Sequence, residues 1–123
     1  MTKIWLAAVG GAALAFAAGC GVGRYVQLGI DDYDRADYVA AMDRFEDLAP
    51  HQTELNDKGL ARYLAYRGLT EYRLGARDAA RDHLLRARAV MARTAPGLVS
   101  GKALREIDEA LTDLGPGPVV VAA

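Results

Sequence analysis

The sequence predicts an all-α fold in which two similar helical hairpins are followed by a single helix. First, the chain aligned with itself at an offset of 39 residues pairs like residues along the first four predicted helices. Second, apolar and small residues recur at helical spacing within each copy. Third, turn residues, above all glycine and proline, separate these segments. We expect helices over residues 22–35, 37–48, 57–74, 76–93 and 101–114.

The repeat places the same kinds of residue in both hairpins. The matched pairs are Tyr25 with Leu64, Gly29 with Gly68, Asp32 with Glu71, Tyr33 with Tyr72, Ala41 with Ala80, Phe45 with Leu84 and Leu48 with Ala87. The glycine and the alanine allow two helices to approach closely, and the aromatic residues fill the space beside them. Each copy is therefore predicted to be one helical hairpin.

These residues resemble the tetratricopeptide repeat, a helix–turn–helix unit of about 34 residues. The first copy carries the resemblance in Tyr25, Leu28-Gly29, Tyr33, Asp37-Tyr38, Ala41, Phe45 and Leu48, and the second in Gly68, Tyr72, Leu74-Gly75, Ala80, Leu84 and Ala87. The second copy departs from the family at Arg67, where leucine is usual, and at Arg77, where tyrosine is usual. The 39-residue period is longer than the family's unit of about 34 residues, and the polar segment 50–58 between the hairpins accounts for the extra length. A generic antiparallel helical bundle is the alternative.

The fifth helix is predicted to cap the array, because a repeat array exposes an apolar face at its end. Its apolar stripe consists of Leu104, Ile107, Leu111 and Leu114. Ser100 is the expected N-cap, and Gly115-Pro116 ends the helix. The folded domain is thus expected over residues 20–115, followed by a tail over 116–123.

The start of the chain predicts export and lipid attachment. Lys3 precedes an uncharged apolar run over residues 4–16, and the small residues Ala17-Ala18-Gly19 lead directly to Cys20, the chain's one cysteine. This order resembles the lipobox of bacterial lipoproteins, which implies that residues 1–19 are a signal peptide and that the Cys20 thiol is acylated. Gly21 after the cysteine implies the outer membrane, with the domain facing the periplasm.

Two alternatives remain for this segment. Ala17 stands where the lipoprotein family usually has leucine. Residues 4–23 contain no charge, and about 20 apolar residues suffice to span a bilayer. The second interpretation is therefore an uncleaved single-span anchor whose repeats mediate self-association. The third is an ordinary signal peptide followed by a free cysteine.

Composition and motifs argue against several classes of function. The 15 basic and 16 acidic residues are interspersed without a basic block, so nucleic acid is not an expected partner. The cluster Asp31, Asp32, Asp34 and Asp37 is expected to be a solvated face, with Asp34 and Asp37 as candidate caps. No catalytic motif is present, and His51 and His83 lie too far apart in sequence for a convincing metal site. We expect no enzyme activity, metal or cofactor.

The tetratricopeptide resemblance implies that a peptide segment binds in the groove lined by the first helix of each hairpin. The partner-binding residues are then Val26, Ile30, Arg62, Tyr66, Leu69 and Arg73, and the resemblance also places Tyr33 and Tyr72 on this face. The competing interpretation puts both tyrosines in the core and leaves Val26, Ile30 and Leu69 undecided. The expected function is a lipid-anchored adaptor that binds a protein partner in the bacterial envelope.

Overall fold

The computed structural model describes residues 19–94 and 97–117, and over these residues the protein is all-helical, as predicted. The helices are α2 (Gly19–Asp34), α3 (Tyr38–Leu48), the short 3-10 helix η1 (Ala49–Glu54), α4 (Asp57–Leu74), α5 (Arg77–Ala92) and α6 (Gly101–Leu114). The bounds agree with the predicted helices within a few residues, and η1 was not predicted. Most of the predicted signal segment, and residues 118–123 of the predicted tail, lie outside the described residues.

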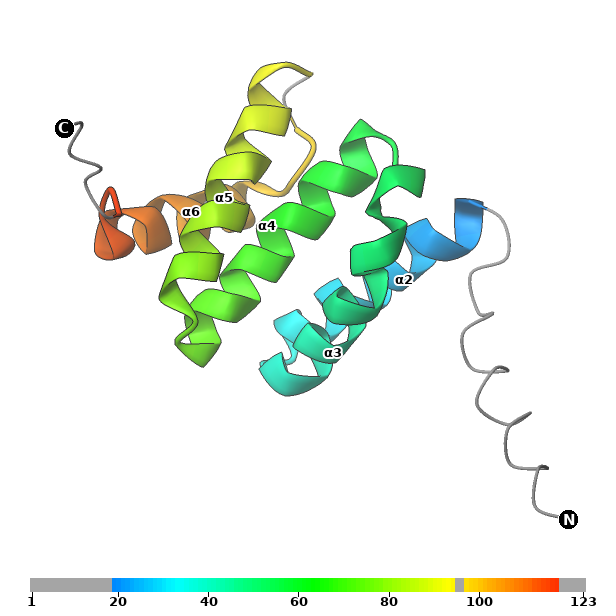
Figure 1. Ribbon diagram of the computed structural model, residues 1–123, viewed down its shortest axis with the longest axis horizontal. Coiled ribbons are helices and arrows are strands. Elements are labelled where there is room, and N and C mark those ends of the chain that lie inside the picture. Colours follow the sequence, from blue (N-terminus) through cyan, green and yellow to red (C-terminus); the bar gives the residue numbers. More distant parts are fainter. Residues whose placement is uncertain (1–18, 95–96, 118–123) are drawn as a thin grey trace, which may run out of the picture.

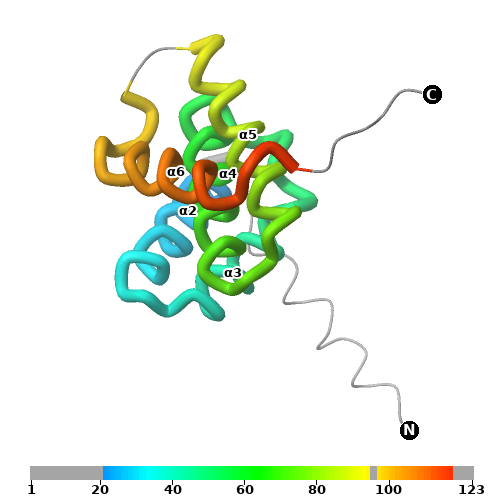
Figure 2. The backbone as a smooth tube through the Cα atoms, turned by 90° about the vertical axis from the view of Figure 1, so that its left-hand side faces the viewer, coloured from blue at the N-terminus to red at the C-terminus, as the bar shows by residue number. Residues whose placement is uncertain are grey.

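Helix α4 is the centre of the arrangement, because it packs against α2, α3, α5 and α6. Figure 1 shows α3 and α5 on the near side of α4, with α2 and α6 behind it. Figure 2, turned by 90°, shows the same two layers from the side. The fold therefore has one layer formed by α3 and α5, one formed by α2 and α6, and α4 between them.

Local sequence signals explain where the helices begin. The side chains of Asp37, Asn56 and Ser100 each accept a hydrogen bond from a backbone N–H of the first helical turn. Such side chains satisfy donors that a helix start leaves unpaired. The predicted caps at Ser100 and Asp37 are thereby confirmed.

The turns inside the two hairpins share an unusual backbone conformation. Ala36, between α2 and α3, has a φ of 61°, and Gly75, which ends α4, has a φ of 86°. These positions are separated by the 39-residue repeat offset. The left-handed region costs glycine little but is unfavourable for alanine, so the first hairpin makes the same turn at a higher conformational cost.

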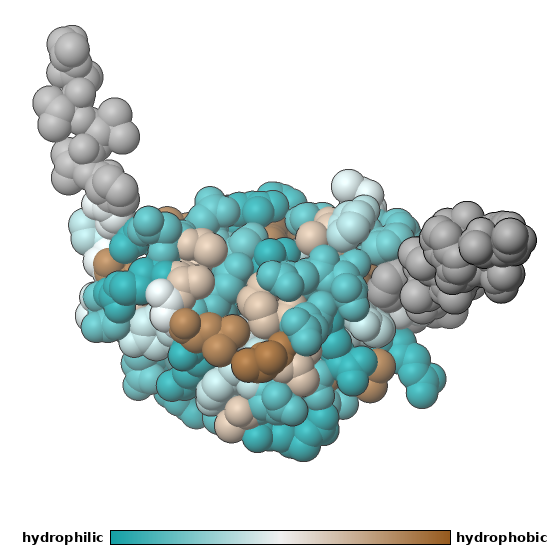
Figure 3. Space-filling model, turned by 60° about the horizontal axis from the view of Figure 1, so that its bottom comes forward, coloured by the Kyte–Doolittle hydropathy of each residue, from teal (hydrophilic) through white to brown (hydrophobic). Residues whose placement is uncertain are grey.

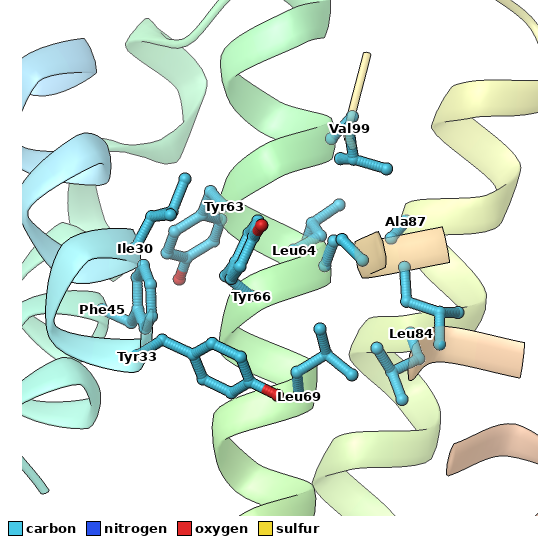
Figure 4. Close-up of a cluster of buried hydrophobic side chains, with 14 of the residues drawn as sticks. Ile30, Tyr33, Phe45, Tyr63, Leu64, Tyr66, Leu69, Leu84, Ala87 and Val99 are labelled. Atoms are coloured by element: carbon cyan, nitrogen blue, oxygen red, sulfur yellow. The ribbon is translucent and has the colours of Figure 1, made fainter. Parts of the chain in front are cut away.

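The core confirms the close helix approach expected at the repeated glycines. A Cβ atom on Gly29 would lie 2.6 Å from the Phe45 ring, and one on Gly68 would lie 2.7 Å from Leu84. Phe45 and Leu84 are fully buried and are themselves matched by the repeat. Figure 4 shows how the core side chains from the two hairpins converge on α4. Phe45 also contacts the buried ring of Tyr63 edge-on, at 6.1 Å between centroids, and so joins the hairpins.

Helix α6 covers the end of the second hairpin with a stripe that differs in part from the predicted one. Its buried residues are Ala103, Ile107, Ala110 and Leu114. Leu104, predicted to be part of the apolar stripe, is 40% exposed. The helix is rotated so that two alanines, rather than Leu104, face α4 and α5. This allows α6 to approach these helices closely.

Candidate functional site

The structure buries the four apolar or aromatic residues assigned to the partner groove. Val26, Ile30, Tyr66 and Leu69 are only 1%, 4%, 8% and 1% exposed. Because α2 packs directly on α4, these side chains form core contacts instead of an open groove. This corrects the predicted picture of an apolar groove floor, and Arg62 and Arg73 remain as the accessible members of the predicted set.

Arg62 is the centre of a polar network between α4 and α2. Its guanidinium donates a hydrogen bond to Oε1 of Gln27, and the Gln27 amide donates to Oδ1 of Asp31 at 2.9 Å. The network crosses the contact between the two helices at the surface. It presents an arginine, an amide and a carboxylate above the buried apolar residues.

Arg73 is the centre of a second network, which reaches α6. Its Nε donates to the Tyr33 hydroxyl at 3.3 Å, and that hydroxyl donates to Oε1 of Glu106 at 2.5 Å. Nη2 of Arg73 lies 3.5 Å from the same carboxylate oxygen, and the guanidinium lies over the Tyr38 ring at 6.0 Å from its centroid. These contacts connect α4 with α2, α3 and α6 while leaving the Arg73 side chain 41% exposed.

The tyrosines of the two repeats differ in burial. Tyr33 is 5% exposed, and its pKa is raised, first by burial and then by its hydrogen bond to Glu106. It therefore remains a neutral donor at any physiological pH. Tyr72 is only partly buried and donates a hydrogen bond to Asp113 of α6 at 2.9 Å. The core interpretation thus holds for Tyr33 and only partly for Tyr72.

Two buried carboxylates were missed as core features by sequence reasoning. Asp32 and Glu71 are 3% and 4% exposed, although Asp32 had been expected on a solvated face. Asp32 accepts a hydrogen bond from Nε of Arg44 at 2.5 Å and another from Arg35. A buried charge is tolerated when it is paired and hydrogen-bonded, which these partners provide.

The second carboxylate is held in the corresponding way. Oε1 of Glu71 lies 2.6 Å from Nδ1 of His83, and Oε2 accepts from Nε of Arg67 at 3.2 Å. Arg67 also donates to the Tyr63 hydroxyl at 2.7 Å. Burial alone would lower the pKa of Arg67, but the bond to Tyr63 and the charge of Glu71 outweigh burial, and the pKa is raised.

The two buried carboxylates occupy equivalent positions in the repeat. Asp32 and Glu71 are matched by the 39-residue offset, and so are their partners Arg44 and His83. The sequence could have indicated these contacts, because an acidic residue and a basic residue recur together at this offset. Their contacts are internal to each hairpin, so their role is to fix its geometry.

The two histidines considered as metal ligands each lie beside a glutamate. Nδ1 of His51 lies 2.8 Å from Oε2 of Glu54 within η1, and His83 is engaged with Glu71. Within the described part of the chain, no group of three or more His, Cys, Asp or Glu side chains is placed to hold a metal ion.

The predicted lipid-attachment site lies immediately beside the folded domain. Cys20 is in the first turn of α2, and Val22, two residues later, is fully buried. None of the helices described here is both long enough and apolar enough to cross a membrane. Most of the alternative span over residues 4–23 lies outside the described residues.

Comparisons with protein-family models, with curated proteins and with solved structures give no match to this chain.

Proposed function

We propose that the protein is a lipid-anchored adaptor of the bacterial envelope that binds a partner protein through the face formed by α2, α4 and α6. The observation that carries the proposal is the position of Arg62 and Arg73 on α4. Eleven residues separate them, which is three helical turns, so they lie on one side of the helix about 16 Å apart. Each leaves its guanidinium at the surface above a rigid, buried floor.

The chemistry of this face suits a polypeptide partner. Arginine presents a planar fork of donors that fits carboxylates and backbone carbonyls, and it is enriched at the energetic centres of interfaces. The neighbouring groups hold the two guanidinium groups in place, which lowers the entropy lost on binding. Figure 3 shows another part of the surface, the lower side of the view in Figure 1, which is largely hydrophilic with a narrow apolar band.

The helix order supports a tetratricopeptide-like arrangement. Helix α4 packs on both helices of the first hairpin, and α6 packs on both helices of the second. The repeated glycine contacts and the repeated contacts of a buried carboxylate add matched internal geometry to this order. In the family that the sequence resembles, the first helices of successive hairpins form the binding face, and α2 and α4 occupy those places here.

The anchor supports the location. If Cys20 is acylated and becomes the first residue, the folded core begins within two residues of the lipid. There is then no flexible tether, and the α2/α4/α6 face is held close to the membrane surface. In this proposal the adaptor positions its partner at the periplasmic side of the outer membrane.

The binding face is tested by a double charge reversal, Arg62→Glu with Arg73→Glu. We expect loss of partner capture from envelope extracts with retained helical circular dichroism. The matched control reverses Arg86 of α5 and Arg93, which follows that helix, because both are exposed and lie outside the α2/α4/α6 face. Equal capture by wild type and the Arg62/Arg73 variant would refute this face.

The anchor is tested by the intact mass of protein purified from membranes. Cleavage before Cys20 with added acyl mass is the expected result. A chain that retains Met1 and an unmodified cysteine would refute the lipoprotein and favour the single-span scaffold. Concentration-dependent self-association of that chain would then support the second interpretation.

A further inference from the structure

Charge is distributed unevenly between α6 and the hairpin on which it packs. Residues 57–93 contain nine basic and four acidic residues, whereas α6 contains two basic and four acidic residues. The second hairpin is therefore net positive and α6 net negative. Opposite charge on packed elements favours one docking register over others.

Three acidic residues of α6 each lie beside an arginine of the second hairpin. Glu106 lies beside Arg73, Asp108 beside Arg88 and Asp113 beside Arg77. Arg73 comes from the end of α4, and Arg77 and Arg88 lie about three turns apart on α5. The α4–α5 surface thus has a row of positive charges matched to acids at three positions of one docked helix.

Arg81 adds a contact that depends on the backbone of α6 rather than on its sequence. Its guanidinium donates to the carbonyl oxygens of Leu114 and Gly115, at 2.8 and 3.0 Å. The last carbonyls of a helix have no partner within the helix and carry its partial negative charge. Arg81 is 14% exposed and accordingly forms a fixed receptor for a helix C-terminus.

The apolar part of the contact is narrow. Its buried residues within α6 are Ala103, Ile107, Ala110 and Leu114, two of which are alanines, and Leu111 and Val99, which precedes the helix, also pack against the core. The Arg77–Asp113 and Arg88–Asp108 pairs are about half exposed, so salt screens them. A narrow apolar stripe together with screened ion pairs makes α6 the element that is most easily exchanged for another helix.

We propose that the α4–α5 surface beneath α6 is a receptor site for an acidic amphipathic helix, and that α6 occupies this site until a partner helix displaces it. The inference rests on the proposed adaptor function and assigns a chemistry to the partner: one of its helices takes the place of α6 in the binding face, beside α2 and α4. The predicted partner helix follows the pattern of α6, counted from the position equivalent to Ala103. It has apolar or small residues at that position and at +4, +7 and +11, and acidic residues at +3, +5 and +10. These are the positions at which α6 carries its buried and its ion-paired side chains.

The test uses the full chain with Glu106→Lys, Asp108→Lys and Asp113→Lys, which reverses the acids on the resident helix. The probe is a fluorescent peptide of residues 99–116 with the wild-type sequence, followed by anisotropy. We expect the variant to bind the peptide at least tenfold more tightly than the wild-type chain, and 0.5 M salt to weaken that binding. Glu109→Lys is the matched control, because no arginine of the described residues pairs with Glu109.

Two outcomes of this assay overturn the proposal. One is absence of peptide binding to a folded variant. The other is equal binding of a scrambled peptide of the same composition, which would show attraction by charge alone. A partner-capture assay that does not respond to Arg62→Glu with Arg73→Glu would refute the adaptor face, whereas the peptide result depends only on the α4–α5 surface.

If the triple variant does not fold, native-state hydrogen exchange of the wild-type chain decides. We expect the amides of α6 to exchange through an opening that leaves α4 protected, and added salt to increase the rate of this exchange. Exchange of α6 only together with α4, through global unfolding, would overturn the proposal.

Discussion

His83 and Glu71 form in the second hairpin the contact that Arg44 and Asp32 form in the first. Nδ1 of His83 lies 2.6 Å from Glu71, and Nε of Arg44 lies 2.5 Å from Asp32. All four residues obey the 39-residue offset, and both carboxylates are buried. The repeat therefore retains a buried contact between a carboxylate and a nitrogen-bearing side chain across the two helices of a hairpin, with arginine in the first and histidine in the second.

This equivalence predicts that His83→Arg is tolerated and His83→Ala is not. Arginine restores the cation found in the first hairpin, whereas alanine leaves Glu71 with Arg67 as its one remaining ion-pair partner among the described residues. Removing one partner of a buried pair is costly, and we expect His83→Ala to lower the free energy of unfolding by about 2 kcal/mol. Urea unfolding of the two variants measures the difference. A His83→Arg protein as unstable as His83→Ala would disprove the equivalence.

The hairpin turns give a second prediction from the same internal symmetry. Ala36→Gly should raise the free energy of unfolding by about 1 kcal/mol, because it relieves a left-handed backbone at a position where the other hairpin has glycine. Gly75→Ala should lower it by a similar amount. A Cβ on Gly75 would have no atom within 4 Å, so backbone conformation alone accounts for that loss. Opposite changes in thermal midpoint would support the argument, and changes of the same sign would contradict it.

The helices could be predicted because their signals are local. Ser100 and Asp37 as caps and Gly75 at the end of α4 each act on neighbouring backbone atoms. The repeat also predicted which helices pack together, because each repeated glycine, Gly29 or Gly68, is followed at the same spacing by a large apolar residue, Phe45 or Leu84. Fold class and helix bounds depend on few long-range contacts.

The candidate site was harder to predict, because its residues are defined by tertiary packing. Val26, Ile30 and Leu69 have side chains that suit a core and an apolar groove equally well, and only the direct contact of α2 with α4 decides between them. Asp32 had the sequence pattern of a solvated acid. Its burial depends on Arg44, twelve residues away on another helix.

The glycines at the helix contacts are predicted to be unequal in their tolerance of alanine. A Cβ on Gly68 would lie 2.7 Å from the Leu84 side chain and 3.1 Å from the Leu84 backbone nitrogen, whereas the three atoms nearest to one on Gly29 all belong to the Phe45 ring. A ring can turn aside, but a backbone atom of a packed helix cannot. We expect losses in unfolding free energy of about 1–3 kcal/mol, with Gly68→Ala the larger.

Gly23→Ala is the control for both of these substitutions. This substitution adds a Cβ within α2 where no atom beyond the helix's own backbone and the adjoining residues lies within 4 Å. Because alanine favours the helix more than glycine does, it should stabilise the protein by about 0.5–1 kcal/mol. Chemical denaturation of all three variants under one condition gives the comparison. Equal losses at Gly29 and Gly68 would show that the backbone contact is not the limiting one.

Acid is predicted to loosen the end of α6 through Asp113. The pKa of this carboxyl is lowered from its ordinary value of 3.8, first by the hydrogen bond from Tyr72 and then by the one from Arg77. A carboxyl whose pKa is lower in the folded state stabilises that state above pH 4, and this contribution is lost as the pH falls through its folded pKa. The amides of residues 111–114 should therefore exchange faster in this acidic range than the intrinsic pH dependence of exchange predicts, because the end of α6 opens more often. In Asp113→Asn this faster exchange should be absent, because the side chain no longer titrates; its persistence there would assign the loosening to another acid.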